Sequence, residues 1–255
     1  MSAGLNRSEA VTTASLPSTL CRNVLFDDDA INVQGFSWCL EEPKTIGLSS
    51  LVGNILCRSH NSKLSELDSA ALETFNAFRE SVRLSDIRRG IIADYLTVKR
   101  FVIDGPLLER WFLKTLINLS IGGKWVVGDG GSAGAPSTNL VEIAFGKRQF
   151  EYGAGLYIVG RSGEAVDSMD RVALTPRTFG ETLVAGTFNF RGYRFYLNLL
   201  PGKVEMDGES HLFYRDAQMK YQVPNRKGRL LLSHEIKFRW KTRPSTLLPS
   251  NSPAY

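Results

Sequence analysis

Cysteine is scarce in this chain, and its three thiols at Cys21, Cys39 and Cys57 are far apart in the sequence. Scattered cysteines do not make a disulfide framework, so they favour a reducing compartment. No apolar run approaches the roughly 18 residues that a membrane-spanning helix needs. The N-terminal segment also lacks the basic start and apolar stretch of a secretory signal. These absences predict a cytoplasmic protein that does not enter a membrane.

Charge and composition are unremarkable for a folded protein. Of the 255 residues, 43% are hydrophobic and 22% are charged, which excludes a wholly disordered or fibrous chain. The formal net charge is +5 and the pI is about 9.1, so the chain is mildly basic. A charge of this size permits contact with nucleic acid but does not require it.

Two helices are predicted in the first half of the chain. Apolar residues recur at helical spacing at positions 67, 71, 75, 78 and 82. Ser65 and Asp68 suggest a capping box at the start of this helix. A second helix is predicted from Gly105 to about Leu119, because Pro106 suits a first turn and the apolar residues that follow lie on one face.

After about Asn139 the residue pattern changes to short strand-like runs, with Gly, Asp or Pro turns between them. The predicted strands cover residues 140–145, 155–159, 187–190, 193–199, 212–214 and 235–240, and residues 31–36 suggest a further small strand or hairpin. A tight hairpin turn is predicted between Phe190 and Tyr193. In the last run His234, Ile236, Phe238 and Trp240 share one face. The second half is therefore predicted to be a mainly antiparallel sheet or sandwich.

Cys57 and His60 form a Cys-x-x-His pair just before the first predicted helix. Zinc is usually held by four ligands that arrive as two such close pairs, so this is half of a zinc site. The alternative is that Cys57 is a small core residue and His60 a surface or capping side chain.

The residues around this pair resemble a known family. The segment Ile55 to Asp68 has the pattern Leu-Cys-x-x-His-Asn-x-x-Leu-Ser-x-Leu-Asp and resembles uncharacterised bacterial proteins related to HNH endonucleases. The resemblance extends to Val33–Trp38 and to Asp104–Thr115, about the first half of the chain. It implies a treble-clef-like ββα module with a zinc site, in which a first Cys-x-x-Cys pair precedes a catalytic His that activates water.

This chain departs from that family at both essential places. No Cys-x-x-Cys pair exists upstream of Cys57, and Cys21 and Cys39 do not form a close pair. The alignment puts Ala10 where the catalytic His stands, and a methyl group cannot act as a general base. We therefore expect a degenerate module that does not cleave nucleic acid.

The predicted fold class is α+β, with the degenerate ββα module and helices followed by the β-rich region. The predicted divisions are a partly disordered lead-in (1–18), the module with its helices (19–125), a Gly-rich connector (126–137), a β-rich domain (138–243) and a disordered tail (244–255). The connector contains Gly128–Pro136, which lacks the Gly-Lys-Ser/Thr ending of a phosphate-binding loop.

Basic side chains near the second helix are the candidates for contact with nucleic acid. They are Arg88, Arg89, Lys99, Arg100, Arg110 and Lys114. The alternative is that these residues form ordinary solubilising faces. Three consecutive carboxylates, Asp27–Asp29, are read as a solvated turn. His211 and His234 have no nucleophile elbow or carboxylate near them in sequence, so a hydrolase triad is not predicted.

Three functions remain open at this point. The first is an inactive HNH-like scaffold that binds nucleic acid or protein. The second is an active metal-dependent endonuclease whose natural chain begins upstream of Met1. The third is a binding module that acts through the C-terminal sheet, with Tyr157, Tyr193 and Tyr214 as contact residues.

Overall fold

The computed structural model describes residues 11–15, 30–33, 42, 44–47, 52–121, 124–160, 163–164, 172–190, 192–202 and 211–240. Within this part the protein combines helices with several sheets, so the predicted α+β class is confirmed. Predictions that concern Ala10, Cys21, Cys39, Asp27–Asp29 and the tail lie outside the described residues. No helix in the described ranges is long and apolar enough to cross a membrane.

Within the described ranges the two predicted helices are present, with two shorter ones. The helices are α2 (Arg58–Lys63), α3 (Ser65–Arg88), α4 (Gly105–Ser120) and α5 (Thr138–Ala144). On α3 the predicted stripe is buried, with Leu67 and Ala71 fully inaccessible and Phe78 almost so. This stripe faces α4 and the sheet, so packing of one apolar face explains why this long helix forms.

The predicted capping box on α3 is wrong. The residue before the helix is Leu64, which has no side-chain capping bond, and the Ser65 hydroxyl donates to the carbonyl of Ser62 at 2.7 Å. Asp68 instead accepts hydrogen bonds from two side chains of α4. A tertiary contact with a cation therefore replaces the local cap that the sequence suggests.

The largest sheet contains six strands in the order β11-β7-β10-β9-β6, with β8 also paired to β9. Its strands are β6 (Val126–Val127), β7 (Gly155–Gly160), β8 (Val172–Phe179), β9 (Thr182–Phe190), β10 (Tyr193–Asn198) and β11 (His211–Tyr214). All pairs are antiparallel except β6 with β9, so the predicted mainly antiparallel sheet is confirmed. Phe190 pairs with Tyr193 in the predicted hairpin.

A second sheet has three strands in the order β12-β13-β5. They are β12 (Gln218–Pro224), β13 (Leu230–Arg239) and β5 (Lys99–Asp104). The strand β5 runs parallel to β13, whereas β12 is antiparallel to it. Two smaller pairs complete the described strands: β1 (Val11–Ser15) with β4 (Val52–Cys57), and β2 (Ala30–Val33) with β3 (Lys44–Gly47).

Two segments differ from their predictions. The run at 140–145, predicted as a strand, forms α5, because Ser137 caps it through Leu140 N (3.4 Å) and Leu140, Ile143 and Ala144 bury one helical face. The predicted connector at 126–137 contributes β6, which pairs with β9, and Ser137 N donates to Val127 O at 3.2 Å. Also, β1 lies inside the predicted lead-in.

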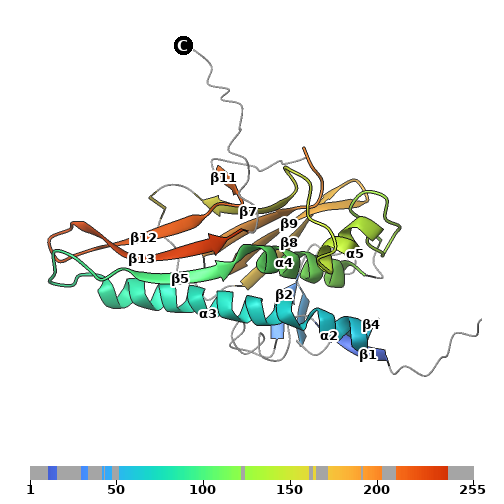
Figure 1. Cartoon of the computed structure of the whole chain (residues 1–255), viewed down its shortest axis with the longest axis horizontal. Coiled ribbons are helices and arrows are strands. Elements are labelled where there is room, and N and C mark those ends of the chain that lie inside the picture. The colour runs from blue at the N-terminus through green and yellow to red at the C-terminus, as the bar shows by residue number, and fades with distance from the viewer. Residues whose placement is uncertain are drawn as a thin grey trace, which may run out of the picture.

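Helices and sheets share one large hydrophobic core, and a smaller separate cluster lies at β7, β9 and β10 of the six-stranded sheet. The ring of Phe112 on α4 lies 4.3 Å from that of Phe188 and 5.4 Å from that of Phe195, and Phe78 on α3 stacks on Tyr193 at 4.3 Å. Figure 1 shows α3 running along the molecule beneath β5, with α4 in front of β8 and β9. The boundary predicted between residues 125 and 138 therefore crosses a single core.

Candidate nucleic-acid interface

Positive charge is concentrated in one hairpin and the segment beside it. Residues 218–240, which form β12, β13 and their turn, contain six Lys or Arg and one Glu. This is a net charge of +5, equal to that of the whole chain. Residues 88–100 add four Lys or Arg and one Asp. Because β5 pairs with β13, the two basic segments belong to one sheet.

The ends of these segments meet at one end of the molecule, where the loop after α3 lies beside the β12–β13 turn (Figure 1). Three hydrogen bonds join them: Gly90 N to Pro224 O (2.8 Å), Arg226 N to Ile91 O (3.1 Å) and Asn225 Nδ2 to Ala93 O (2.9 Å). We call residues 89–95 together with 225–230 the basic tip.

The β12–β13 turn holds its shape through Asn225 and Gly228. The Asn225 side-chain oxygen accepts the N–H groups of Lys227 (2.9 Å) and Arg229 (3.0 Å). Gly228 has a φ of 77°, a left-handed value that favours glycine. This ordered turn presents exposed cations at positions 226, 227 and 229, and the loop joined to it adds Arg89. Lys227 is 3.4 Å from Asp94, but both are well exposed, so the pair contributes little.

The basic surface continues on the face of the three-stranded sheet that points away from α3, which we call the outer face. Its centre is Glu235, whose carboxylate lies 3.2 Å from Arg100 Nε and 3.7 Å from Lys237 Nζ. Lys220 on β12 is in register with Glu235 on β13. Three cations around one carboxylate leave this face positive. The neighbouring residues His234, Ile236 and Phe238 are buried on the inner face, as the predicted alternation requires.

Four of the six cations predicted from the sequence lie at this sheet. Arg89 and Lys99 are exposed, and Arg100 pairs with Glu235. Arg88 is partly buried and donates to the carbonyl and hydroxyl oxygens of Ser233, so it holds α3 to β13. The cations of residues 218–240 were not predicted, although their local excess of charge can be read from the sequence.

The other two predicted cations, Arg110 and Lys114, do not belong to a binding surface. Lys114 is only 5% exposed, and its Nζ lies 2.8 and 2.9 Å from the two carboxylate oxygens of Asp68. Arg110 donates to Ala144 O at 3.1 Å and lies 3.3 Å from Glu66. This prediction is wrong because the polar side of α4 packs against α3 and α5 rather than facing solvent.

The predicted zinc pair lies where β4 meets α2. Cys57 ends β4, and His60 follows in α2 with an exposed side chain whose ring is 5.5 Å from that of Phe145. Among the residues that the structure describes, no three His, Cys, Asp or Glu side chains converge as a metal site would require. Zinc binding by Cys57 and His60 therefore stays a prediction.

A buried polar network lies beneath the three-stranded sheet of β12, β13 and β5, which we call the basic sheet. Ser81 Oγ is hydrogen-bonded to His234 Nε2 and accepts the hydroxyl of Tyr193 at 2.5 Å, while His234 Nδ1 is 3.0 Å from Ser233 Oγ. Ser81 and His234 are both 0% exposed. Burial lowers the pKa of His234 to about 4, so its ring is neutral at pH 7. No substrate reaches this Ser–His pair, and its role is to join α3 to β13 and β10.

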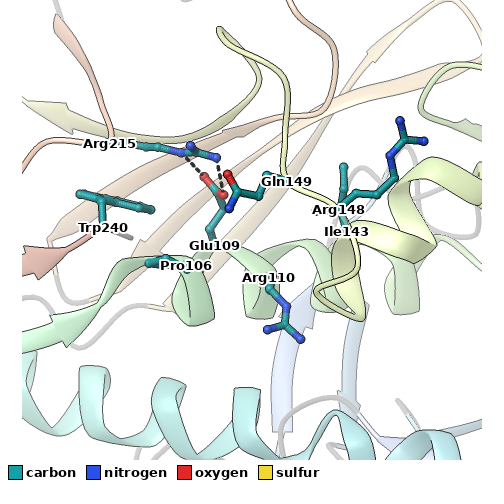
Figure 2. A pocket seen from close by; sticks show the side chains of 8 residues that line it. All are labelled: Pro106, Glu109, Arg110, Ile143, Arg148, Gln149, Arg215 and Trp240. Carbon is teal, nitrogen blue, oxygen red and sulfur yellow. Dashed lines mark hydrogen bonds and ion pairs between the residues drawn. The ribbon is translucent and has the colours of Figure 1, made fainter. Parts of the chain in front are cut away.

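A pocket opens where the start of α4 meets Arg215 and Trp240 (Figure 2). Among its lining residues Glu109 is a buried charged group, whose carboxylate accepts hydrogen bonds from Arg215 Nε (3.0 Å) and Nη2 (2.8 Å) and from Leu156 N (2.8 Å). Burial raises the pKa of Glu109, although Arg215 opposes the shift. Arg215 also lies over the rings of Tyr214 and Trp240, at 5.2 and 5.5 Å.

This pocket does not converge on a ligand position. Figure 2 shows the guanidinium groups of Arg110 and Arg148 pointing away from the Glu109–Arg215 pair. The pair itself uses its hydrogen bonds within the protein. The basic sheet is therefore the stronger candidate for a functional surface.

The tyrosines predicted as contacts of the C-terminal sheet are not exposed. Tyr157 is 8% and Tyr193 3% accessible, and Tyr214 is half-buried, with its hydroxyl donating to Ala154 O at 3.1 Å. Their rings fill the two sides of the sheet, so this part of the third hypothesis is wrong.

Comparisons with protein-family models, with curated proteins and with solved structures found no match to this chain.

Proposed function

We propose that this chain is a nucleic-acid-binding scaffold that contacts phosphates through the basic tip and the outer face. The observation that carries the proposal is the net charge of +5 in residues 218–240, presented on one ordered hairpin. Lys and Arg contacts with phosphates release counterions and supply most of the affinity in sequence-independent binding. The neighbouring strand β5 extends the same surface through Arg100.

The chemistry of this surface suits the backbone of the nucleic acid better than its base edges. The outer face presents Lys, Arg and Gln side chains from strands, and the tip presents cations from a turn and a loop. Phosphate contacts fix position but carry no sequence information. The binding is therefore sequence-tolerant and falls steeply as salt rises.

The resemblance to HNH-type proteins supports the same class of ligand. The strand β1 is antiparallel to β4, and α2 follows Cys57 directly, although β2 and β3 lie between β1 and β4 in the chain. This module is proposed to be a degenerate treble-clef that keeps a structural role. It does not cut, because Ala10 stands where the resemblance places the general base.

Neutralising two cations of the tip tests the proposal. In fluorescence anisotropy with a labelled oligonucleotide, Arg226→Gln/Arg229→Gln should weaken binding about tenfold and lower the salt slope by about 1.4 to 1.8. The control Lys147→Gln/Arg177→Gln removes the same charge from exposed sites on other elements and should change affinity less than about twofold.

Two results would contradict the proposal. One is that the tip and control variants weaken binding equally, which would show that affinity depends on the net charge of the chain and not on the basic tip. The other is absence of binding at low salt. In the same preparations, supercoiled plasmid should remain intact with Mg²⁺ or Mn²⁺. Cleavage would favour the alternative of an active endonuclease.

A further inference from the structure

The basic tip is also the most apolar part of the described surface. Eleven large hydrophobic side chains are exposed among the described residues, and five of them lie on the tip or next to it. They are Ile87, Ile91, Ile92, Tyr95 and Leu230. Ile92 is 74% exposed and Tyr95 is 84% exposed. Clustered apolar exposure of this kind marks a binding surface more often than isolated exposed residues do.

The backbone beneath these side chains is held in place. The loop that bears Ile92 and Tyr95 is hydrogen-bonded to the β12–β13 turn on both sides of Ile92, through Ile91 O and Ala93 O. Leu230 follows the same turn. Side chains on a fixed backbone bind with a smaller loss of conformational entropy than those on a loop that must first become ordered.

Unpaired nucleic acid offers both chemistries that the tip presents. Its phosphates match the cations at 89, 226 and 229, and its free base faces match the ring of Tyr95. A duplex covers its base faces by pairing and stacking, so it would leave the apolar side chains in water.

The extent of the cationic surface favours a strand over a lipid surface. Residues 230–236 of β13 bear no Lys or Arg, and the next cation on that strand is Lys237, roughly 25 Å from Arg229 at about 3.3 Å per residue. Lys220 and Arg100 on the neighbouring strands are both in register with Glu235, so they form a second group of cations with Lys237. A bilayer would engage the apolar tip alone, whereas an extended strand also reaches the outer face.

We infer that this chain binds single-stranded nucleic acid, with phosphates on the cations of the tip and on the second group around Lys237, and an unstacked base against Tyr95. Ile92 and Leu230 contact the adjoining base or sugar. This inference rests on the proposed function and narrows its ligand to unpaired strands.

Anisotropy with a labelled 20-nucleotide single strand and its matching duplex tests the inference. The unmodified protein should bind the single strand about tenfold more tightly. Tyr95→Ser should weaken single-strand binding about tenfold, whereas Tyr95→Phe should bind as the unmodified protein does. The salt slope should be unchanged by Tyr95→Ser, because no phosphate contact is lost. Tyr152→Ser changes a 59% exposed tyrosine elsewhere and should have no effect.

The possible failures are distinguishable. Equal affinity for duplex and single strand, or an unaffected Tyr95→Ser variant beside a weakened Arg226→Gln/Arg229→Gln variant, would overturn the inference and leave the proposed function standing. No binding to either nucleic acid would overturn both. If vesicles of anionic phospholipid bind the protein, and Tyr95→Ser abolishes only that binding, the tip recognises lipid and the inference is wrong.

Discussion

At the scale of single residues, the Glu109–Arg215 pair is the most constrained feature. Glu109 on α4 bonds both to the start of β7 and to a residue 106 positions away. Arg215 has a φ of 42°, the only positive φ among the described residues that are not glycine. A left-handed arginine is uncommon, and here the ion pair with Glu109 and the two aromatic rings stabilise it. The sequence alone gives no sign that these two residues form an ion pair.

Removing one partner of this pair should destabilise the fold. Arg215→Met leaves the Glu109 carboxylate buried without a counter-charge, which costs about 3 to 5 kcal/mol of unfolding free energy. The double variant Glu109→Gln/Arg215→Met should recover much of that loss, because no buried charge remains. Urea unfolding of the two variants and the unmodified protein measures both effects.

The same pair gives a pH dependence. Without Arg215 the pKa of Glu109 rises further above that of the unfolded chain, so the folded state holds its proton more tightly. The stability of Arg215→Met should therefore fall as the pH rises from 5 to 8. Equal stability at the two pH values, or a double variant as unstable as Arg215→Met, would show that Glu109 is not buried as described.

At the scale of elements, local signals explain the predictions that hold. Helix α4 begins where predicted because Pro106 occupies its first turn and Asp104 accepts Leu107 N at 2.9 Å. Apolar residues that recur at helical spacing predict the position of α3 in the same way. The segment of α5 was predicted as a strand because five of the six residues at 140–145 are apolar, and a run this short does not separate a strand from a helix. The cap at Ser137 decides between the two.

Elements without a local signal were missed. β5 is a short run of charged and apolar residues whose pairing with β13 is parallel and distant in sequence. β12 has mostly polar, exposed residues on one face, and β8 contains Pro176. Such strands form because partners from elsewhere in the chain supply their hydrogen bonds and cover one face.

The cap of α4 can be tested directly. Asp104→Ala removes the acceptor for Leu107 N and should lower the unfolding free energy by about 1 kcal/mol, within about 0.5 to 2. Asp86→Ala changes an exposed aspartate near the end of α3, where no capping bond is lost, and should be nearly neutral. Similar losses in the two variants in urea unfolding would contradict the capping role.

At the scale of the whole molecule, one core holds the two predicted domains together, and this assembly creates the basic surface. The core places α3 against β5, β12 and β13, which brings residues 88–100 and 218–240 into one sheet. Each group of cations can be read from the sequence, but the sequence does not show that the two groups lie side by side in the fold. It also gives no sign that Arg110 and Lys114 would be enclosed, because their partners lie on other elements.

The most direct test of the central claim is a nuclear magnetic resonance titration of the labelled protein with an oligonucleotide. The account predicts backbone amide shifts at Arg89 and Tyr95 on the loop and at Arg229 and Lys237 on the hairpin, which fade together as salt is added. Shifts confined to α2 around His60, or to the pocket around Glu109, with the hairpin unchanged, would contradict it.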